Sequence, residues 1–386
     1  MRVAVKRSEL IEYFKYIIVA IRKDRWVANL FYRLADKNTR NGIQIFEDFC
    51  KSGHMKEKDI LAMRVLGDDA QIPAYRFENV LLRKNRRFYN GDESNFVNLF
   101  ASDYNDDFPD PFVRADILNW LYQVQALSGP TGDKGLFQVS ELARSLQVYG
   151  HSLAVIYREL AYLARKNLVL CENSAMPIEE GDLVKITIPG ALHLQMLRNV
   201  SYLSACAEDT LFKNTEVMTR ISNRLKFHES DSKLVVALNA RDLVNYLIEY
   251  RKEYLTNSDE LVSEKAIISS VDLNDSLHAV EQWIQADENL KKTISEIDYF
   301  TVDMDVDACV VSKNSGGVVC TIADKDVKGF ISSLEPKYSF PHDVYSKIKP
   351  GDILKCKVMA VSYTHLTLPT NPRVRRQRQM CIRDSI

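Results

Sequence analysis

The sequence predicts a multidomain, mainly α-helical chain that ends in a small β-barrel lacking its last strand. Apolar residues recur every three to four positions through most of residues 1–298, which is typical of amphipathic helices. From about residue 299 the spacing changes to alternation, which indicates short β-strands. A length of 386 residues is enough for two to four domains.

The composition is that of a globular protein. It is 46% hydrophobic and 27% charged, with a formal net charge of −1. This charge argues against a general binder of polyanions, although local basic patches are compatible with it. No apolar run approaches the roughly 18 residues of a membrane span. The cysteines show no CxxC spacing, so we expect free thiols, a cytoplasmic location and no membrane partner.

Residues 1–66 are predicted to form three helices. The first has an apolar face, and Asp24 is placed to cap the second. Residues 67–110 form a mixed connecting segment with a turn at Asn90-Gly91.

Residues 111–200 show the order of a winged helix-turn-helix. A helix over 112–126 is followed by two helices that Ser140 and Ser152 are placed to cap. Two strand-like runs, "LVLCE" and "LVKITI", come next. Three helices followed by a two-stranded ribbon predict a winged helix.

Residues 201–298 are predicted to be a helical spacer, and residues 299–360 a truncated OB fold. The spacer contains helical periodicity but no motif that indicates chemistry. The alternating region contains four strand-like runs, whereas an OB barrel needs five.

Residues 361–386 are expected not to be native. Their parts "VSYTHL" and "QMCIRDS" back-translate to DNA strings that are nearly reverse complements and match a transposon-end sequencing adapter. Such segments are left out of fold reasoning. This tail holds five arginines and one aspartate, so without it the net charge of −1 becomes −5. A real basic arm is the alternative.

The segment 299–360 resembles the S1 domain, an RNA-binding OB fold. The resemblance rests on the runs 316–319, 329–331 and 351–358. It implies binding of single-stranded RNA, although Ser315, Val318 and Ser332 replace residues that the family often has. Phe330 is expected in the core. The remaining candidates for RNA contact are Lys313, Lys328, Tyr338, Phe340 and His342. A protein-contact or purely structural barrel stays open.

Two runs, over residues 34–54 and 72–100, resemble the helical lid of STAND/AAA-type P-loop ATPases and the stretch that follows it. The resemblance is carried by "LADKNTRNGIQIFEDFCKSGH" and "IPAYRFENVLLRKNRRFYNGDESNFVNLF". It implies that Arg40 senses nucleotide phosphates in a longer parent chain containing ATP and magnesium. None of the 14 glycines precedes a lysine, so the sequence has no phosphate-binding loop. We therefore expect no enzyme activity and no cofactor here.

The rival hypothesis is a DNA-binding transcriptional regulator that uses the helix over 151–166. Its exposed side chains are expected to be His151, Ser152, Arg158, Tyr162, Arg165 and Lys166, with Glu159 opposing them. The ribbon that follows carries four acidic residues against one lysine, which disfavours a phosphate backbone. We therefore favour a winged helix that packs against protein.

The basic run "LLRKNRRFY" is interpreted as a solvated edge, with nucleic-acid contact as the alternative. Catalytic and metal motifs such as HExxH and GxSxG are missing, so no catalytic or metal residue is predicted. The sequence thus indicates an adaptor or regulatory region that binds nucleic acid, with RNA favoured. Its other partners would be proteins or the ATPase core.

Overall fold

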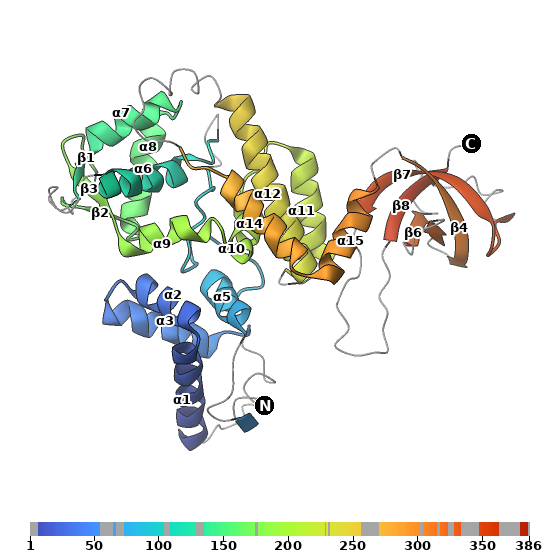
Figure 1. The fold of residues 1–386 in the computed structure, drawn as a ribbon, viewed down its shortest axis with the longest axis horizontal. Helices are drawn as coiled ribbons and strands as arrows, with labels where there is room; N and C mark the ends of the chain where they lie inside the picture. Colours follow the sequence, from blue (N-terminus) through green and yellow to red (C-terminus); the bar gives the residue numbers. More distant parts are fainter. Residues whose placement is uncertain are drawn as a thin grey trace. The chain divides into compact units, whose positions relative to one another are not determined.

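The computed structural model describes most of the chain. The described ranges are 7–54, 65–66, 73–103, 109–127, 135–173, 177–227, 229–230, 232–255, 270–300, 304–314, 317–322, 328–332, 347–362 and 379–384. They contain thirteen helices and two small sheets (Figure 1). The chain divides into two compact units, which are Met1–Lys213 with Asn239–Val280, and Asn214–Leu238 with Glu281–Ile386.

The first unit begins with three helices, as predicted. They are α1 (Arg7–Lys23), α2 (Arg25–Ala35) and α3 (Thr39–Lys51). Asp24 caps α2 as expected, because its Oδ1 accepts hydrogen bonds from the backbone N–H groups of Trp26 and Val27. Phe14 of α1 meets Phe46 of α3 edge to face, with ring centroids 5.9 Å apart. Helix α2 also packs against α9, introduced below.

A connecting helix, α5 (Ala74–Arg83), follows and is joined to the first three helices by polar contacts. The Trp26 indole N–H donates to Glu78 over 3.1 Å. At the end of α5 the Arg83 guanidinium forms an ion pair with Glu208, and both side chains are 1% exposed. Glu208 also accepts the backbone N–H of Tyr89 over 2.7 Å. A buried charge is tolerated when it is paired in this way.

Residues 113–196 contain four helices and three short strands. The elements are α6 (Val113–Leu127), β1 (Phe137–Gln138), α7 (Val139–Val148), α8 (Leu153–Arg165), β2 (Val169–Cys171), β3 (Leu183–Ile186) and α9 (Ile188–Met196). The sheet is antiparallel in the order β1-β3-β2. Figure 1 shows α6, α7 and α8 gathered beside this sheet.

The predicted helices and ribbon of this region are confirmed, with two differences at their ends. Ser140 lies inside helix α7, because the short strand β1 runs directly into the helix and Gln138 occupies the N-cap without a side-chain capping hydrogen bond. Strand β1 has two residues, too few to produce a recognisable alternation. Ser152 does occupy the N-cap of α8, but its side chain makes no capping hydrogen bond.

The two cap residues provide a matched test of helix capping. Asp24→Ala is expected to lower the free energy of unfolding by about 1 kcal/mol, because two backbone N–H groups lose their acceptor. Ser152→Ala is expected to cost less than about 0.5 kcal/mol, because no side-chain cap bond is lost. Chemical denaturation of both variants measures the difference. Equal losses would contradict this account of the caps.

The rest of the first unit is helical. Helix α10 (Val200–Asp209) follows α9, while α12 (Lys233–Tyr254) and α14 (Asn274–Gln285) contribute residues to both units. Tyr246 and Tyr250 lie one turn apart on α12, and Tyr250 is 3% exposed. The Tyr250 hydroxyl donates to the carbonyl of Pro109 over 2.6 Å, which ties α12 to the start of the α6 region.

The second unit combines helices with the larger sheet. Its elements are α11 (Thr215–Phe227), α15 (Glu288–Asp298), β4 (Asp305–Asn314), β5 (Gly317–Ile322), β6 (Lys328–Ser332), β7 (Ile353–Ser362) and β8 (Gln379–Asp384). Strands β4 to β7 match the four predicted runs. One face of the sheet is a continuous core that includes Val310, Cys320, Ile331 and Val358.

The strand order places β4 between β5 and β7, while β6 pairs with β5. The expectation of four strands was incomplete, because residues 379–384 form β8. This strand is antiparallel to β7 and meets β6 at one residue pair, Phe330 with Cys381. Only this one residue pair links β8 to β6, so the described strands do not form a closed barrel. Its pairing does not bear on the origin of the tail, because an open strand edge can pair with any extended segment.

Candidate functional site: a polar joint between residues 89–103 and α8

The joint is built around residues 89–103, which we call the strap. The strap has no regular secondary structure, yet its centre is buried. Its five central residues are at most 3% exposed: Phe96, Val97, Asn98, Leu99 and Phe100. A buried segment without a helix or a ladder must find hydrogen-bond partners elsewhere. In this protein side chains supply them.

Helices α9 and α10 hold the backbone of the strap. The Val97 N–H donates to Nε2 of His193 over 2.9 Å, and the Val97 carbonyl accepts from the Tyr202 hydroxyl over 2.7 Å. Nδ1 of His193 lies 2.7 Å from the carbonyl of Pro189. Nδ1 therefore carries the proton and Nε2 is the acceptor. Burial lowers the pKa of His193 to about 4, so the ring stays neutral near pH 7.

Asn98 connects the strap to both sides. Its side-chain amide donates to Thr210 Oγ1 over 3.2 Å, while its Oδ1 accepts the Phe100 N–H over 2.9 Å. Its backbone carbonyl accepts from Nη1 of Arg114 over 3.1 Å. One residue thereby links α10, the strap and α6.

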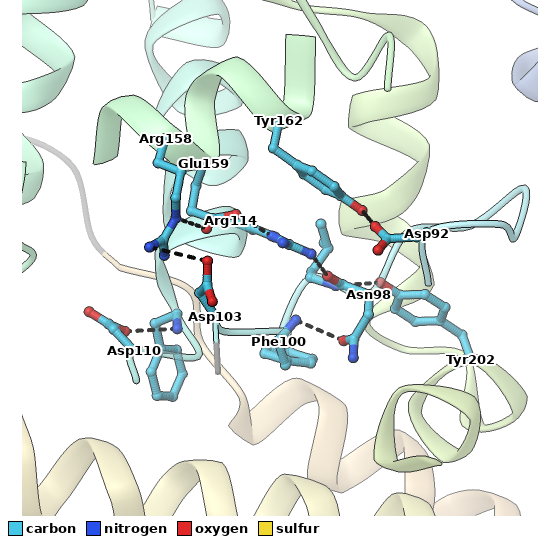
Figure 2. Close-up of polar contacts among 12 residues, drawn as sticks. Asp92, Asn98, Phe100, Asp103, Asp110, Arg114, Arg158, Glu159, Tyr162 and Tyr202 are labelled. Atoms are coloured by element: carbon cyan, nitrogen blue, oxygen red, sulfur yellow. Dashed lines mark hydrogen bonds and ion pairs between the residues drawn. The ribbon is translucent and has the colours of Figure 1, made fainter. Parts of the chain in front are cut away.

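Arg114 and Glu159 form the charged centre of the joint (Figure 2). Arg114 reaches from α6, and its Nε donates to Oε2 of Glu159 on α8 over 2.6 Å. The exposed fractions of the two side chains are 12% and 4%. Arg158 donates to the other oxygen of Glu159 over 2.8 Å and lies 3.7 Å from Asp103 of the strap. A carboxylate bound at both oxygens is well compensated for its burial.

Tyr162 completes the α8 face. The Arg114 guanidinium lies 3.9 Å from the centre of its ring, within the range of a cation–π contact. The Tyr162 hydroxyl donates to Asp92 over 2.7 Å, and Lys166 donates to the backbone carbonyl of Asp92. Burial is the main cause that raises the pKa of Tyr162, so the hydroxyl remains a donor. Figure 2 shows Tyr162 pointing from α8 to Asp92.

The apolar side chains of the strap stabilise the joint in addition to its polar contacts. Each large apolar side chain that is fully buried contributes about 1.5–3 kcal/mol. The four in the strap together contribute roughly 6–12 kcal/mol by the same measure.

The structure corrects the predicted DNA-binding surface of α8. His151 was expected to be exposed, but it is buried between Asp110 and Asp116. His151 precedes helix α8, so helical periodicity does not predict which way its side chain points. Glu159 was expected on the exposed surface and is 3% exposed.

Three other residues predicted on this surface, Arg158, Tyr162 and Lys166, are half-buried and contact the strap. Ser152 and Arg165 are exposed.

The other predicted site residues lie apart from this joint. Arg40 is exposed in the first turn of α3, where its backbone N–H donates to the capping Asn38. Lys313 is half-buried near the end of β4, where the register places it opposite the buried Val318. Lys328 lies on β6 opposite Thr321. Tyr338, Phe340 and His342 lie outside the described residues.

The described residues offer no arrangement for nucleophilic catalysis at the buried histidines. His151 has both ring nitrogens against carboxylates, and Ser270 donates to Asp116 rather than to that ring. Among all the residues that the structure describes, no group of three or more His, Cys, Asp or Glu side chains is placed to hold a metal ion. No described helix combines the length and apolarity needed to span a membrane.

Three residues of the joint, Asp92, Asp103 and Arg114, were not predicted as site residues, and Glu159 was predicted on the surface. Arg114 and Glu159 are 45 positions apart, and Tyr162 and Asp92 are 70 apart. Neither pair has a local spacing that identifies its partner. The sequence offered one signal for this joint, the position of Glu159 within an otherwise basic helix. A glutamate in that position is compatible with a buried ion pair as well as with a solvated charge.

Comparisons of the chain with protein-family models, curated proteins and solved structures found no match.

Proposed function

We propose that this chain is a nucleic-acid-binding regulatory or adaptor region, with single-stranded RNA as its ligand. In this proposal the larger sheet is an S1-like OB fold that binds RNA. Residues 111–200 are a winged helix used for packing, and residues 1–66 are the lid of a STAND-like ATPase parent. The chain itself carries no catalytic residue in this proposal.

The observation that carries the RNA proposal is the strand order β7-β4-β5-β6. Three consecutive strands followed by a fourth that returns to the first is the Greek-key order. OB folds are Greek-key barrels, and they bind single strands with stacking aromatics beside basic residues. This support does not depend on β8.

The register also supports a binding face on β5 and β6. Residues directly opposite in a ladder share a face. Phe330 pairs with the half-buried Val319, and Lys328 pairs with the half-buried Thr321. In this proposal the two pairs provide the binding face, and Phe330 serves as a stacking residue instead of the core residue expected from the sequence. An aromatic and a lysine two positions apart suit base stacking and phosphate contact.

Packing of the winged helix is supported by the polar joint. The third helix of a DNA-binding winged helix presents its side chains to the major groove. On α8, Arg158, Tyr162 and Lys166 contact the strap instead. The acidic residues Glu172, Glu179 and Glu180 of the ribbon are exposed. These features favour packing over the rival function of a DNA-binding transcriptional regulator.

Binding of a labelled single-stranded RNA, followed by fluorescence anisotropy, tests the proposal. Phe330→Ala is expected to weaken binding about 10- to 100-fold, because one stacking contact is worth about 1–3 kcal/mol. Lys328→Ala is expected to reduce the slope of log affinity against log salt by about 0.7. Circular dichroism of each variant establishes that the fold is retained.

Lys355→Ala is the matched control, because Lys355 is exposed opposite Asp307 on β7, which is three strands from β6 in the order β6-β5-β4-β7. It is expected to leave affinity nearly unchanged. Absence of RNA binding at low salt, or an equal loss with the control, would overturn the RNA proposal. Tighter binding to duplex DNA, lost on Arg165→Ala, would instead support the transcriptional regulator.

A further inference from the structure

A buried histidine joins three separate segments of the first unit. Nδ1 of His151 lies 2.5 Å from Oδ2 of Asp110, and Nε2 lies 3.0 Å from Oδ2 of Asp116. The His151 side chain is fully buried, and the Asp116 side chain is 1% exposed. His151 immediately precedes the N-cap of α8, whereas Asp110 precedes α6 and Asp116 belongs to it.

The two aspartates also accept hydrogen bonds from backbone N–H groups of two separate segments. Asp110 accepts the N–H of Phe112 over 2.9 Å. Asp116 accepts the N–H of Val271 over 2.8 Å and the hydroxyl of Ser270 over 2.9 Å. The cluster therefore fixes residues 109–112 and residues 270–271 at the same point.

Hydrogen-bond chemistry determines the charge of this histidine. A neutral imidazole has one N–H and can donate to one carboxylate only. Its other nitrogen would direct a lone pair at the second carboxylate. With a proton on both nitrogens, each contact becomes a charge-assisted hydrogen bond. Two aspartates are then balanced by His151 and by Arg251, whose Nη2 lies 3.7 Å from Asp116.

We propose that His151 is a buried imidazolium that acts as a proton-dependent clasp, fastening residues 109–112 and 270–271 to the start of α8. The clasp is closed at neutral pH. In alkaline solution His151 loses one proton, one of its two hydrogen bonds is lost, and a buried carboxylate is left without its partner. The inference concerns the first unit and does not rest on RNA binding.

The electrostatics of the cluster support the clasp. Burial alone lowers the pKa of His151, but the hydrogen bonds with Asp110 and Asp116 outweigh it and raise the pKa to about 9. Burial likewise raises the pKa of Asp116, but His151 and Arg251 outweigh it and lower the pKa overall. The other titratable group beside the ring is Tyr149, whose pKa is raised mainly by burial.

The direction of the pH dependence follows from a pKa that folding raises. The contribution of His151 to stability is complete below about pH 6.5, the ordinary value for histidine. It is lost as the pH rises through about 9. His193 has the opposite sign, because its lowered pKa causes loss on the acidic side. Burial also raises the pKa of the Cys50 and Cys206 thiols, which adds to the alkaline loss, so the contribution of His151 is the difference between the wild type and His151→Gln.

Nitrogen NMR of the full chain labelled in its histidines tests the charge directly. The His151 signals, assigned by their disappearance in His151→Gln, are expected to show both ring nitrogens protonated at about pH 8, where ordinary histidines are neutral. Their titration midpoint is expected near pH 9. If no histidine of the folded wild-type chain were doubly protonated at about pH 8, the proposal would be overturned, and that outcome requires no variant.

Hydrogen exchange tests the clasp itself. After correction for base-catalysed intrinsic rates, the Phe112 and Val271 amides are expected to lose protection above pH 9. The exposed His278 provides the control, because His278→Gln should leave this loss unchanged. His151→Gln should remove the pH dependence. Unchanged protection of both amides across the titration of His151 would show a charged histidine without a clasp, and would overturn that part.

Discussion

Replacing Glu159 with alanine is expected to lower the free energy of unfolding by about 3–5 kcal/mol. Removal of one member of a buried ion pair leaves the other charge without compensation, which is the origin of losses of this size. Here the variant leaves Arg114, 12% exposed, without its carboxylate. Arg158 loses the same partner. Urea unfolding monitored by circular dichroism measures the change.

Arg158→Ala is the matched control for this prediction. Arg158 contacts the same carboxylate as Arg114, but its side chain is 35% exposed. Its loss is expected to cost less than about 1 kcal/mol, as is usual for solvent-accessible ion pairs. If the two variants lost the same stability, the Arg114–Glu159 pair would not be the centre of the joint.

Gly190→Ala is expected to cost about 3 kcal/mol or more and to lower the yield of folded protein. An added Cβ at Gly190 would lie 2.2 Å from the carbonyl oxygen of Leu168 and 2.8 Å from Cγ1 of Ile186. The first of these atoms belongs to the backbone, so relief requires α9 to move away from Leu168, the residue before β2. Overpacking that forces such backbone shifts costs about 1–3 kcal/mol, and more in severe cases.

Gly181→Ala is the control, because an added Cβ there meets no atom within 4 Å. It is expected to be neutral or to stabilise by up to about 1 kcal/mol, since alanine restricts the unfolded chain. Thermal unfolding of both variants separates the steric effect at Gly190 from the general effect of replacing glycine. Similar melting temperatures would contradict the close approach of α9 and β2.

Local pattern was enough to predict the elements. The helix expected over 112–126 is observed at Val113–Leu127, and the runs "LVLCE" and "LVKITI" contain β2 and β3. Four strands after residue 299 were also predicted. These features depend on apolar periodicity and on capping residues such as Asp24. Both signals lie within a few consecutive residues, so they can be recognised without the tertiary structure.

The candidate site was not predictable in the same way. A polar residue on a helix has the same local pattern whether it faces solvent or a buried partner. His151 and Glu159 were therefore placed on the surface, although Asp110, Asp116 and Arg114 enclose them. The partners lie 35–45 positions away in the sequence. Only the tertiary structure brings them together.

The strap has a consequence for how the chain folds. Its backbone partners His193 and Tyr202 are 96 and 105 residues away from Val97, so its docking closes a long loop and is slow. Until α9 and α10 are in place, the run "FVNLF" over 96–100 is open to solvent without charge or proline. Such a segment favours intermolecular β-pairing. The residues that are buried in the folded joint are thus the same residues that favour association between chains before α9 and α10 have formed.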